Sequence, residues 1–255
     1  MIPWFSYEVI NLGFIKLQVW GILVSLGFIA GMIVSYWQFK KRKLSPDNIF
    51  DLIFWIIIGS IIGARLLYVL EYWRFFSGDY FEIIKMWHGG MSVYGGFIGA
   101  TIAGTIYLLK KEFDFWAHID ALIFSLPLGL FIGRLGCFFI HDHPGIETDF
   151  FLGVQYAGGV RHDLGLYLSL NGLILFLVFL FLGRKKRFDG FYTAFFAMWY
   201  GIARFLLDFL RANDVFGADA RYFNLTLAQY LSLALFIFGI ILFFKLKNMP
   251  AKKLT

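Results

Sequence analysis

Charged residues are scarce in this chain of 255 residues, because Asp, Glu, Lys and Arg make up only 16% of it. A soluble domain contains about 25% of them. Apolar residues reach 60% and aromatic residues 21%, and the mean hydropathy is +0.72. This balance excludes an ordinary soluble protein and predicts a polytopic membrane protein.

Cysteine is almost absent as well. Cys137 is the only one, so the chain cannot form an internal disulfide and the redox compartment cannot be inferred. The first residues lack a basic stretch and a small-residue cleavage site. We therefore expect no removable signal peptide, and the first apolar segment should remain as an anchor. No low-complexity tract interrupts the apolar segments.

Long apolar segments are abundant, and a helix of about 20 residues crosses the hydrocarbon core of a bilayer. Seven segments reach that length, at approximately residues 17–39, 49–72, 91–109, 117–139, 165–183, 190–211 and 226–246. The sequence therefore predicts an all-α integral membrane protein with about seven transmembrane helices, forming one polytopic domain over residues 1–255.

Basic residues gather at one set of segment ends, at residues 40–43, 110–111 and 184–187 and in the C-terminal tail. Because cytoplasmic loops collect Lys and Arg, the N-terminus is predicted to lie outside and the C-terminus inside. The net charge of +6 is then an orientation signal, and no nucleic-acid partner is expected. The outer loop 140–164 is expected to form a small extracytoplasmic cap.

Glycines recur at four-residue spacing in three of the apolar segments. The pairs are Gly59 and Gly63, Gly95 and Gly99, and Gly129 and Gly133. Small residues at this spacing let membrane helices approach closely. The simplest interpretation is helix packing.

Three arginines, Arg65, Arg134 and Arg204, lie within or near the outer halves of apolar segments. An Arg at the centre of a membrane helix costs about 2.5–3.5 kcal/mol, so it needs a partner or a function. Tyr200, Arg204 and Asp208 share one helical stripe, and Asp208 is the one obvious acidic partner. We expect the three arginines to converge on one pocket, where their excess positive charge suits an anionic ligand, and Arg binds phosphate in a bidentate way. Alternatively, Arg204 pairs internally with Asp208 and the other arginines reach the membrane interface.

Histidines mark the two longest outer loops. His88 precedes a glycine pair and is a candidate proton acceptor near neutral pH, or is simply hydrogen-bonded. Tyr94 is placed to orient a phosphate or ester oxygen. The stretches 141–145 and 161–163 hold further His and Asp, but no metal-ligand spacing is present and no metal site is expected. Cys137 is either a reactive thiol or a packing residue.

The stretches HGGMSVYGG at 88–96 and GRLGCFFIHDHPG at 133–145 resemble the bacterial prolipoprotein diacylglyceryl transferases. The hallmark of that family is Gly-Arg-x-Gly-Asn-Phe-x-Asn-x-Glu-x-x-Gly, preceded by a His-Gly-Gly segment. Further stretches that are similar to family segments follow in the correct order, at 63–69, 161–168, 200–211 and 227–233. The resemblance covers nearly the whole chain.

The resemblance implies transfer of the diacylglyceryl group of phosphatidylglycerol to the lipobox cysteine thiol of a preprolipoprotein, with release of glycerol phosphate. The expected partners are this lipid, other membrane lipids and the signal-peptide region of the preprolipoprotein. No metal or other cofactor is implied. The expected location is the bacterial cytoplasmic (inner) membrane, with multiple passes.

The resemblance also implies residue roles. Arg134 would bind the lipid phosphate, Arg204 would stabilise the departing phosphate, and His88 would accept the thiol proton. Asp208, in place of the family's Glu, would hold Arg204. The remaining substrate-binding positions are Arg65, Tyr94, Gly136, Asp142, Gly145 and Tyr200; Asp142 stands at the family's loop Glu and Gly145 at its closing glycine.

Several positions depart from the family pattern. Cys137 and Ile140 stand in place of two Asn, Asp163 in place of a Pro, and Leu168 in place of a Glu. Three alternatives therefore stay open beside the transferase. They are a paralogue acting on another acceptor or anionic lipid, a non-enzymatic carrier of lipids or anions, and an inactive relative.

Overall fold

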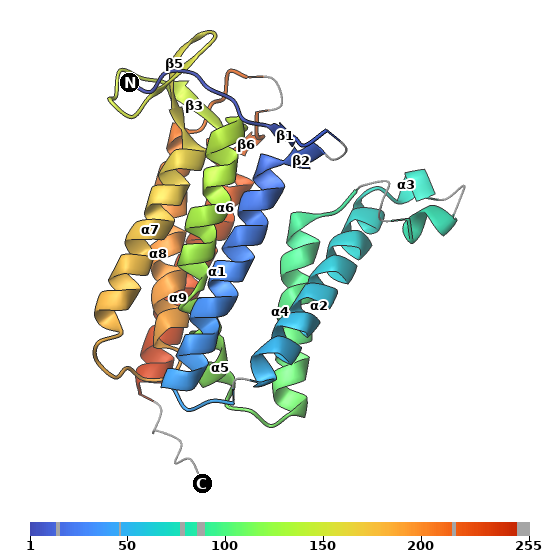
Figure 1. Ribbon diagram of the computed structural model, residues 1–255, viewed down its shortest axis with the longest axis vertical. Coiled ribbons are helices and arrows are strands. Elements are labelled where there is room, and N and C mark those ends of the chain that lie inside the picture. The colour runs from blue at the N-terminus through green and yellow to red at the C-terminus, as the bar shows by residue number, and fades with distance from the viewer. Residues whose placement is uncertain (14–15, 46, 77–79, 86–89, 216–217, 249–255) are drawn as a thin grey trace. The chain divides into compact units, whose positions relative to one another are not determined.

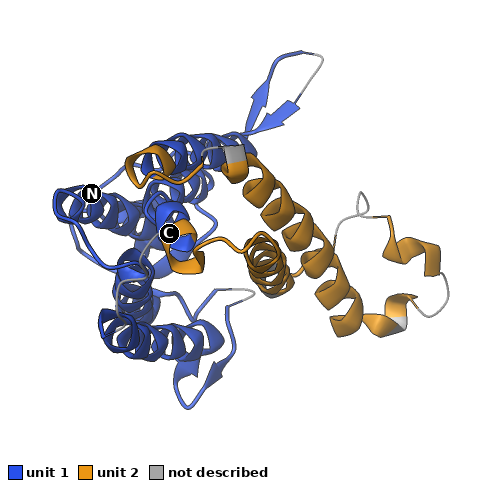
Figure 2. Ribbon diagram, turned by 90° about the horizontal axis from the view of Figure 1, so that it is seen from below, with its two compact units in different colours: residues 1–38, 119–255 blue, residues 39–118 orange. Residues whose placement is uncertain are grey.

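The computed structural model describes residues 1–13, 16–45, 47–76, 80–85, 90–215 and 218–248. The chain divides into two compact units, which Figure 2 shows in two colours. The first combines Met1–Gln38 with Ile119–Thr255, and the second is Phe39–His118. Each unit is described by itself, and the expected single domain over residues 1–255 stays a prediction.

Six helical segments of the described residues are long and apolar enough to cross a membrane. They are Val19–Lys41, Asn48–Glu71, Phe115–Ile140, Leu164–Leu182, Phe191–Leu210 and Leu227–Lys247. Many of their apolar side chains face outward, with Phe28 66%, Leu70 68% and Phe181 66% exposed, as lipid-facing helices require. The chain is therefore a mostly helical, multi-pass membrane protein. The expected segment 91–109 forms a shorter apolar helix, so the seventh crossing stays a prediction.

The first unit is a bundle of long helices with short strands at one end, as Figure 1 shows. Its helices are α1 (Val19–Lys41, which ends in the second unit), α5 (Phe115–Ile123, which begins in the second unit), α6 (Leu126–Ile140), α7 (Leu164–Leu182), α8 (Phe191–Leu207), η3 (Asp208–Leu210) and α9 (Leu227–Lys247). Its strands are β1 (Val9–Asn11), β2 (Lys16–Gln18), β3 (Pro144–Glu147), β4 (Val154–Tyr156), β5 (Gly159–Asp163), β6 (Arg221–Tyr222) and β7 (Leu225–Thr226).

The predicted span 117–139 is interrupted between α5 and α6. Pro127 stands in the first turn of α6 and has no backbone N–H, so the helix restarts there. The hydroxyl of Ser125 donates to the carbonyl of Leu122 at 2.8 Å and lies 2.7 Å from the hydroxyl of Ser35 on α1. These contacts satisfy polar groups that the break would otherwise leave bare in an apolar bundle.

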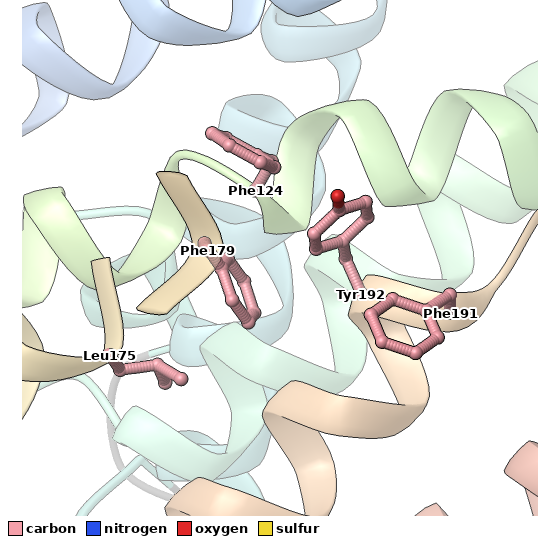
Figure 3. Close-up of a cluster of buried hydrophobic side chains, with 5 residues drawn as sticks. All are labelled: Phe124, Leu175, Phe179, Phe191 and Tyr192. Atoms are coloured by element: carbon pink, nitrogen blue, oxygen red, sulfur yellow. The ribbon is translucent and has the colours of Figure 1, made fainter. Parts of the chain in front are cut away.

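A cluster of buried side chains joins α7, α8 and the α5–α6 junction. Figure 3 shows its members, which are Phe124, Leu175, Phe179, Phe191 and Tyr192. Phe124 and Phe179 lie 5.0 Å and 5.1 Å from the Tyr192 ring in edge-to-face contacts, the geometry that aromatic pairs prefer. The cluster lies at the end of α7 away from the strands, so it holds the bundle together far from the cap.

The segment expected to form a cap does form a compact structure. Strands β3, β5 and β4 make an antiparallel sheet in that order, and Ile2 pairs with Val154 at the outer side of β4. Gly145 of β3 forms a bridge with Arg211, which follows η3. The sheet therefore ties the end of α6, the start of α7 and the end of α8 together. The predicted extracytoplasmic location of this cap stays a prediction.

The second unit consists of α2 (Asp47–Glu71) packed against α4 (Val93–Lys110), with α3 (Trp73–Phe76) and the short helix η1 (Tyr80–Ile83) in between along the chain. Two of the predicted glycine pairs form the α2–α4 contact. A Cβ at Gly99 would lie 2.0 Å from the carbonyl oxygen of Gly59, and one at Gly63 would lie 2.3 Å from that of Gly95. The packing interpretation of these glycines is confirmed.

We expect Gly99→Ala to destabilise the chain, because the atom that its Cβ would meet belongs to the backbone of Gly59 and cannot rotate away. Overpacking of this kind costs about 1–3 kcal/mol in unfolding free energy. Gly104→Ala on the same helix is the control, since its nearest neighbour is the flexible Ile56 side chain at 3.1 Å. Denaturation by SDS in mixed micelles measures both, and equal stabilities would contradict the close crossing.

Candidate functional site

Arg134 lies on α6, half-buried, and its Nη1 donates to the Sγ of Cys137 at 3.8 Å. The Sγ of Cys137, a carboxylate oxygen of Asp142 and a ring nitrogen of His143 lie within 4.8 Å of one another. Arg134 has no carboxylate partner among the described residues. The structure thus brings two predicted site residues, Arg134 and Asp142, around Cys137, together with His143.

His141 turns the chain at the end of α6. Its backbone is left-handed, with φ of +49°, and its buried ring lies 4.7 Å from the rings of both Trp4 and Phe5. Its Nδ1 is 2.6 Å from Oδ2 of the buried Asp163, and its buried Nε2 has no hydrogen-bond partner in the described part of the chain. This anchored turn directs Asp142 and His143 back toward Cys137.

The carboxylate of Asp163 connects three parts of the fold by hydrogen bonds. Beside His141, its Oδ1 accepts from the backbone N–H of Leu166 and so caps α7, and its Oδ2 accepts from the hydroxyl of Tyr156 on β4 at 2.9 Å. Burial, followed by the charge of Asp163, raises the pKa of Tyr156, so this hydroxyl remains a donor. The sequence analysis noted Asp163 in the His/Asp stretch 161–163 and as a departure from a family pattern, but not as an N-cap, although Asp before an apolar helix is a typical one.

Arg204 and Asp208 form the pair that their four-residue spacing predicts. The Nη1 of Arg204 donates to Oδ1 of Asp208, whose side chain is completely buried. No other hydrogen bond joins this guanidinium to the described residues, so most of its donors are available. Tyr200, one turn earlier, stacks on Phe196 with ring centroids 5.4 Å apart.

Thr226 completes this arrangement from the start of α9. Its hydroxyl donates to Oδ2 of Asp208, so both carboxylate oxygens have partners. Thr226 and Gln229 also form a capping box, and the Gln229 amide donates to the Phe205 carbonyl at 3.2 Å. The sequence analysis missed Thr226 and placed Gln229 only within the family-like stretch 227–233, although Thr-x-x-Gln before an apolar run is the pattern of a capping box.

Two predicted glycines occupy tight contacts. A Cβ at Gly136 would lie 3.2 Å from Cα of Trp20 on α1, and one at Gly145 would lie 2.5 Å from the carbonyl oxygen of Leu210. Both positions therefore let backbones approach closely. Their expected role toward substrate stays a prediction.

Arg161 on β5 fastens the cap. Its guanidinium donates to both carboxylate oxygens of Asp214, at 2.9 and 2.6 Å, and to the carbonyl of Gly145 at 3.1 Å. Hydrogen bonding to Arg161 holds the pKa of Asp214 below its usual value. Nearby, burial lowers the pKa of His162, whose Nδ1 lies 2.6 Å from the hydroxyl of Tyr167.

Arg65 belongs to the second unit, where its side chain binds backbone carbonyls of the segment between α2 and α4. Its guanidinium donates to the backbone carbonyls of Ile83 and Gly90, both at 2.8 Å, and of Glu82. Gly90 has φ of +81° and packs on the Tyr68 ring, a position that favours glycine. Its predicted convergence with Arg134 and Arg204 stays a prediction.

Two predicted residues cannot be placed. His88 lies outside the described residues, and so does the side chain of Tyr94, whose backbone lies in the first turn of α4. Arg65 holds the carbonyls on both sides of the segment that carries His88. The roles of His88 and Tyr94 therefore stay predictions.

A family model described as prolipoprotein diacylglyceryl transferase matches residues 8–245. Proteins named phosphatidylglycerol–prolipoprotein diacylglyceryl transferase are similar along most of their length. That of Listeria monocytogenes strain EGD-e is 31% identical over 255 residues, covering 94% of this chain and 90% of the relative. Those of Finegoldia magna and Geobacter sulfurreducens are each 34% identical, covering 93% and 90% of this chain and 94% and 91% of the relatives.

The Arg161–Asp214 pair predicts a pH dependence. Because the folded-state pKa of Asp214 is lowered, the pair stabilises the fold above the ordinary value of 3.8, and this contribution is lost as pH falls through the lowered value. Asp214→Asn should lower the thermal midpoint at pH 7, and the gap to the unmodified chain should close at acidic pH. Thermal unfolding in detergent between pH 7 and 3 measures this, and a gap that does not change with pH would contradict it.

Proposed function

Because the chain belongs to the prolipoprotein diacylglyceryl transferase family, we propose that it transfers the diacylglyceryl group of phosphatidylglycerol to the cysteine thiol of a preprolipoprotein. Glycerol phosphate is the second product. The observation that carries this proposal is Arg134, a guanidinium in a membrane helix without a carboxylate partner among the described residues, with Arg204 held by Asp208 in the same unit.

The chemistry requires positioned cations. The bond between the glyceryl carbon and the phosphate oxygen breaks only if the charge that grows on the phosphate is offset. In our proposal Arg134 binds the lipid phosphate and Arg204 stabilises it as it departs. Asp208 and Thr226 hold Arg204 in position, and the low dielectric of the bundle strengthens these interactions.

The remaining roles follow the family resemblance. His88 accepts the proton of the acceptor thiol, and Tyr94 and Tyr200 orient the lipid head group. Arg65 supports the loop that carries His88, and the loop with Asp142 and Gly145 closes the site toward the acceptor. The preprolipoprotein presents its signal-peptide region to this loop.

We propose seven crossings, with α4 as the additional one, in the bacterial cytoplasmic membrane. The basic stretches at residues 40–43, 110–111 and 184–187 support a cytoplasmic C-terminus. The N-terminus and the sheet of β3, β5 and β4 then lie outside. In this proposal residues 1–255 form one polytopic membrane domain, which admits the lipid from the bilayer.

Arg134→Ala should reduce transfer by at least about 100-fold, the usual effect of losing one group that stabilises developing charge. Arg134→Lys should keep part of the activity, because an ammonium attracts phosphate but cannot bind it in a bidentate way. The assay follows labelled phosphatidylglycerol onto a lipobox peptide.

Arg184→Ala is the control for this experiment. Arg184 follows the end of α7 opposite the cap, and its guanidinium carbon lies 5.5 Å from the centre of the Phe181 ring. It should insert and transfer normally. Near-normal lipidation by Arg134→Ala would refute the proposed function. Lipid movement across vesicles without a lipidated peptide would favour the carrier alternative.

Thr226→Val should lower kcat more than it changes KM, because it removes one of the two groups that fix Asp208 and so loosens Arg204. Thr226→Ser retains the hydroxyl and should restore activity. Purified variants are compared at equal folded concentration, judged by thermal unfolding in detergent. Equal kcat for Thr226→Val and the unmodified chain would show that the hydroxyl has no part in positioning Arg204.

A further inference from the structure

Four aromatic rings form a continuous row on one side of the cap. The ring centroids of Phe151 and Phe150 lie 4.5 Å apart, those of Phe150 and His162 lie 6.1 Å apart, and those of His162 and Tyr167 lie 5.4 Å apart. The row runs from the loop between β3 and β4 to the first turn of α7. Phe150 is 44% and Phe151 66% exposed. Exposed apolar groups that lie together mark an interaction surface.

The row continues into the lipid-facing side of α7. Tyr167, Ile174 and Phe181 follow one another at seven-residue spacing, so they lie on one side of the helix. Ile174 and Phe181 are exposed, and α7 is long and apolar enough to cross a membrane. The aromatic row is therefore the continuation, on the cap, of a helix side that lipid covers.

The register of the sheet places the exposed phenylalanines at the level where α7 begins. The loop leaves β3 where the backbone N–H of Thr148 donates to the carbonyl of Val160 at 3.0 Å, and it joins β4 where Val154 pairs with Arg161. It thus crosses β5 toward α7, at whose start the sheet lies (Figure 1). Phe150 meets His162, which is two residues or about 7 Å of strand before the first residue of α7.

Backbone hydrogen bonds fix the loop with its two phenylalanines outward. The N–H of Phe150 donates to the hydroxyl of Thr148 at 3.1 Å, and the N–H of Gly153 donates to the carbonyl of Phe150 at 2.8 Å. The N–H of Ile2 in turn donates to the carbonyl of Gly153, also at 2.8 Å. The exposure of the two rings is thus built into the folded loop.

We propose that Phe150 and Phe151 insert into the bilayer interface beside the start of α7 and anchor the cap to the membrane surface. Water is an unfavourable environment for these rings, and the interface removes them from it. The Tyr167 ring, at the end of the lipid-facing side, lies at the head-group level where tyrosine is enriched. In the proposed orientation this is the outer leaflet. The anchor is independent of the proposed transfer reaction.

The attachment is apolar and not electrostatic. Glu147 and Asp149, in and beside the same loop, are exposed, so their charges repel an anionic lipid surface. Burial lowers the pKa of His162 from its ordinary value of 6.5, so its ring is neutral at pH 7 and suits a row of apolar rings. The contact with lipid should therefore persist at high salt, which screens charges and leaves apolar burial intact.

The anchored loop also holds the turn that follows α6. Through the hydrogen bonds of Ile2 with Gly153 and Gln155 it fixes the N-terminal segment, whose Trp4 ring lies 4.7 Å from the ring of His141. His141 turns the chain toward Asp142. The anchor thereby fixes the distance between the membrane surface and this turn.

A nitroxide spin label at position 151 tests the anchor. The full chain with Phe151→Cys is labelled and placed in vesicles of phosphatidylethanolamine and phosphatidylglycerol. Its collisions with oxygen, which concentrates in lipid, and with a water-soluble nickel chelate are then measured by power saturation. The ratio of oxygen to nickel collisions should be higher than for a label at Ala157→Cys, the exposed turn between β4 and β5 at the end of β5 away from α7. The unmodified chain, treated with the same reagent, gives the background from the buried Cys137.

Each other outcome overturns the anchor. Equal ratios at positions 151 and 157, or a high ratio at 151 that high salt abolishes, would exclude apolar insertion. A high ratio that arises only after a lipobox peptide is added would assign this surface to the peptide. Dipolar broadening between labels at 151 would assign it to a second copy of the chain. Phe150→Cys is the second position, and thermal unfolding in detergent confirms that both labelled variants are folded.

Discussion

A guanidinium inside an apolar bundle must be compensated, and the buried carboxylate of Asp208 does this for Arg204. The carboxylate is itself fixed by Thr226, which begins the next helix. Breaking such a buried pair is costly, about 3–5 kcal/mol, because one charge is left alone. The bundle can therefore hold a cation in one orientation with most of its donors unused by the described residues, and binding a phosphate within the membrane requires such donors.

The other arginine of the first unit is placed by different means. The one hydrogen bond of the Arg134 guanidinium to the described residues goes to the thiol of Cys137, and the groups around that thiol come from the turn after α6. His141 and Asp163 hold the turn, and Asp163 also caps α7 and accepts from Tyr156. The cap and the candidate site thus share one buried polar network, so the sheet positions the groups to which we assign the lipid head group and the acceptor.

The sequence predicted the features that depend on local spacing. Apolar length predicted the membrane helices, and a four-residue spacing predicted that Arg204 meets Asp208 and that glycines lie at helix crossings. It did not predict the break before Pro127, although proline lacks the N–H that an unbroken helix needs. It also missed the contact of His141 with Asp163 and the return of Asp142 and His143 to Cys137, because these depend on a turn whose left-handed backbone is stabilised by residues distant in sequence. The roles of His88 and Tyr94 still depend on the family resemblance alone.

An experimental structure with an unreactive phosphatidylglycerol analogue bound would examine the proposed phosphate site itself. We expect phosphate oxygens about 2.7–2.9 Å from guanidinium nitrogens of both Arg134 and Arg204. A lipid phosphate bound elsewhere, with these two guanidiniums in contact with other groups, would contradict the proposed role of the arginines.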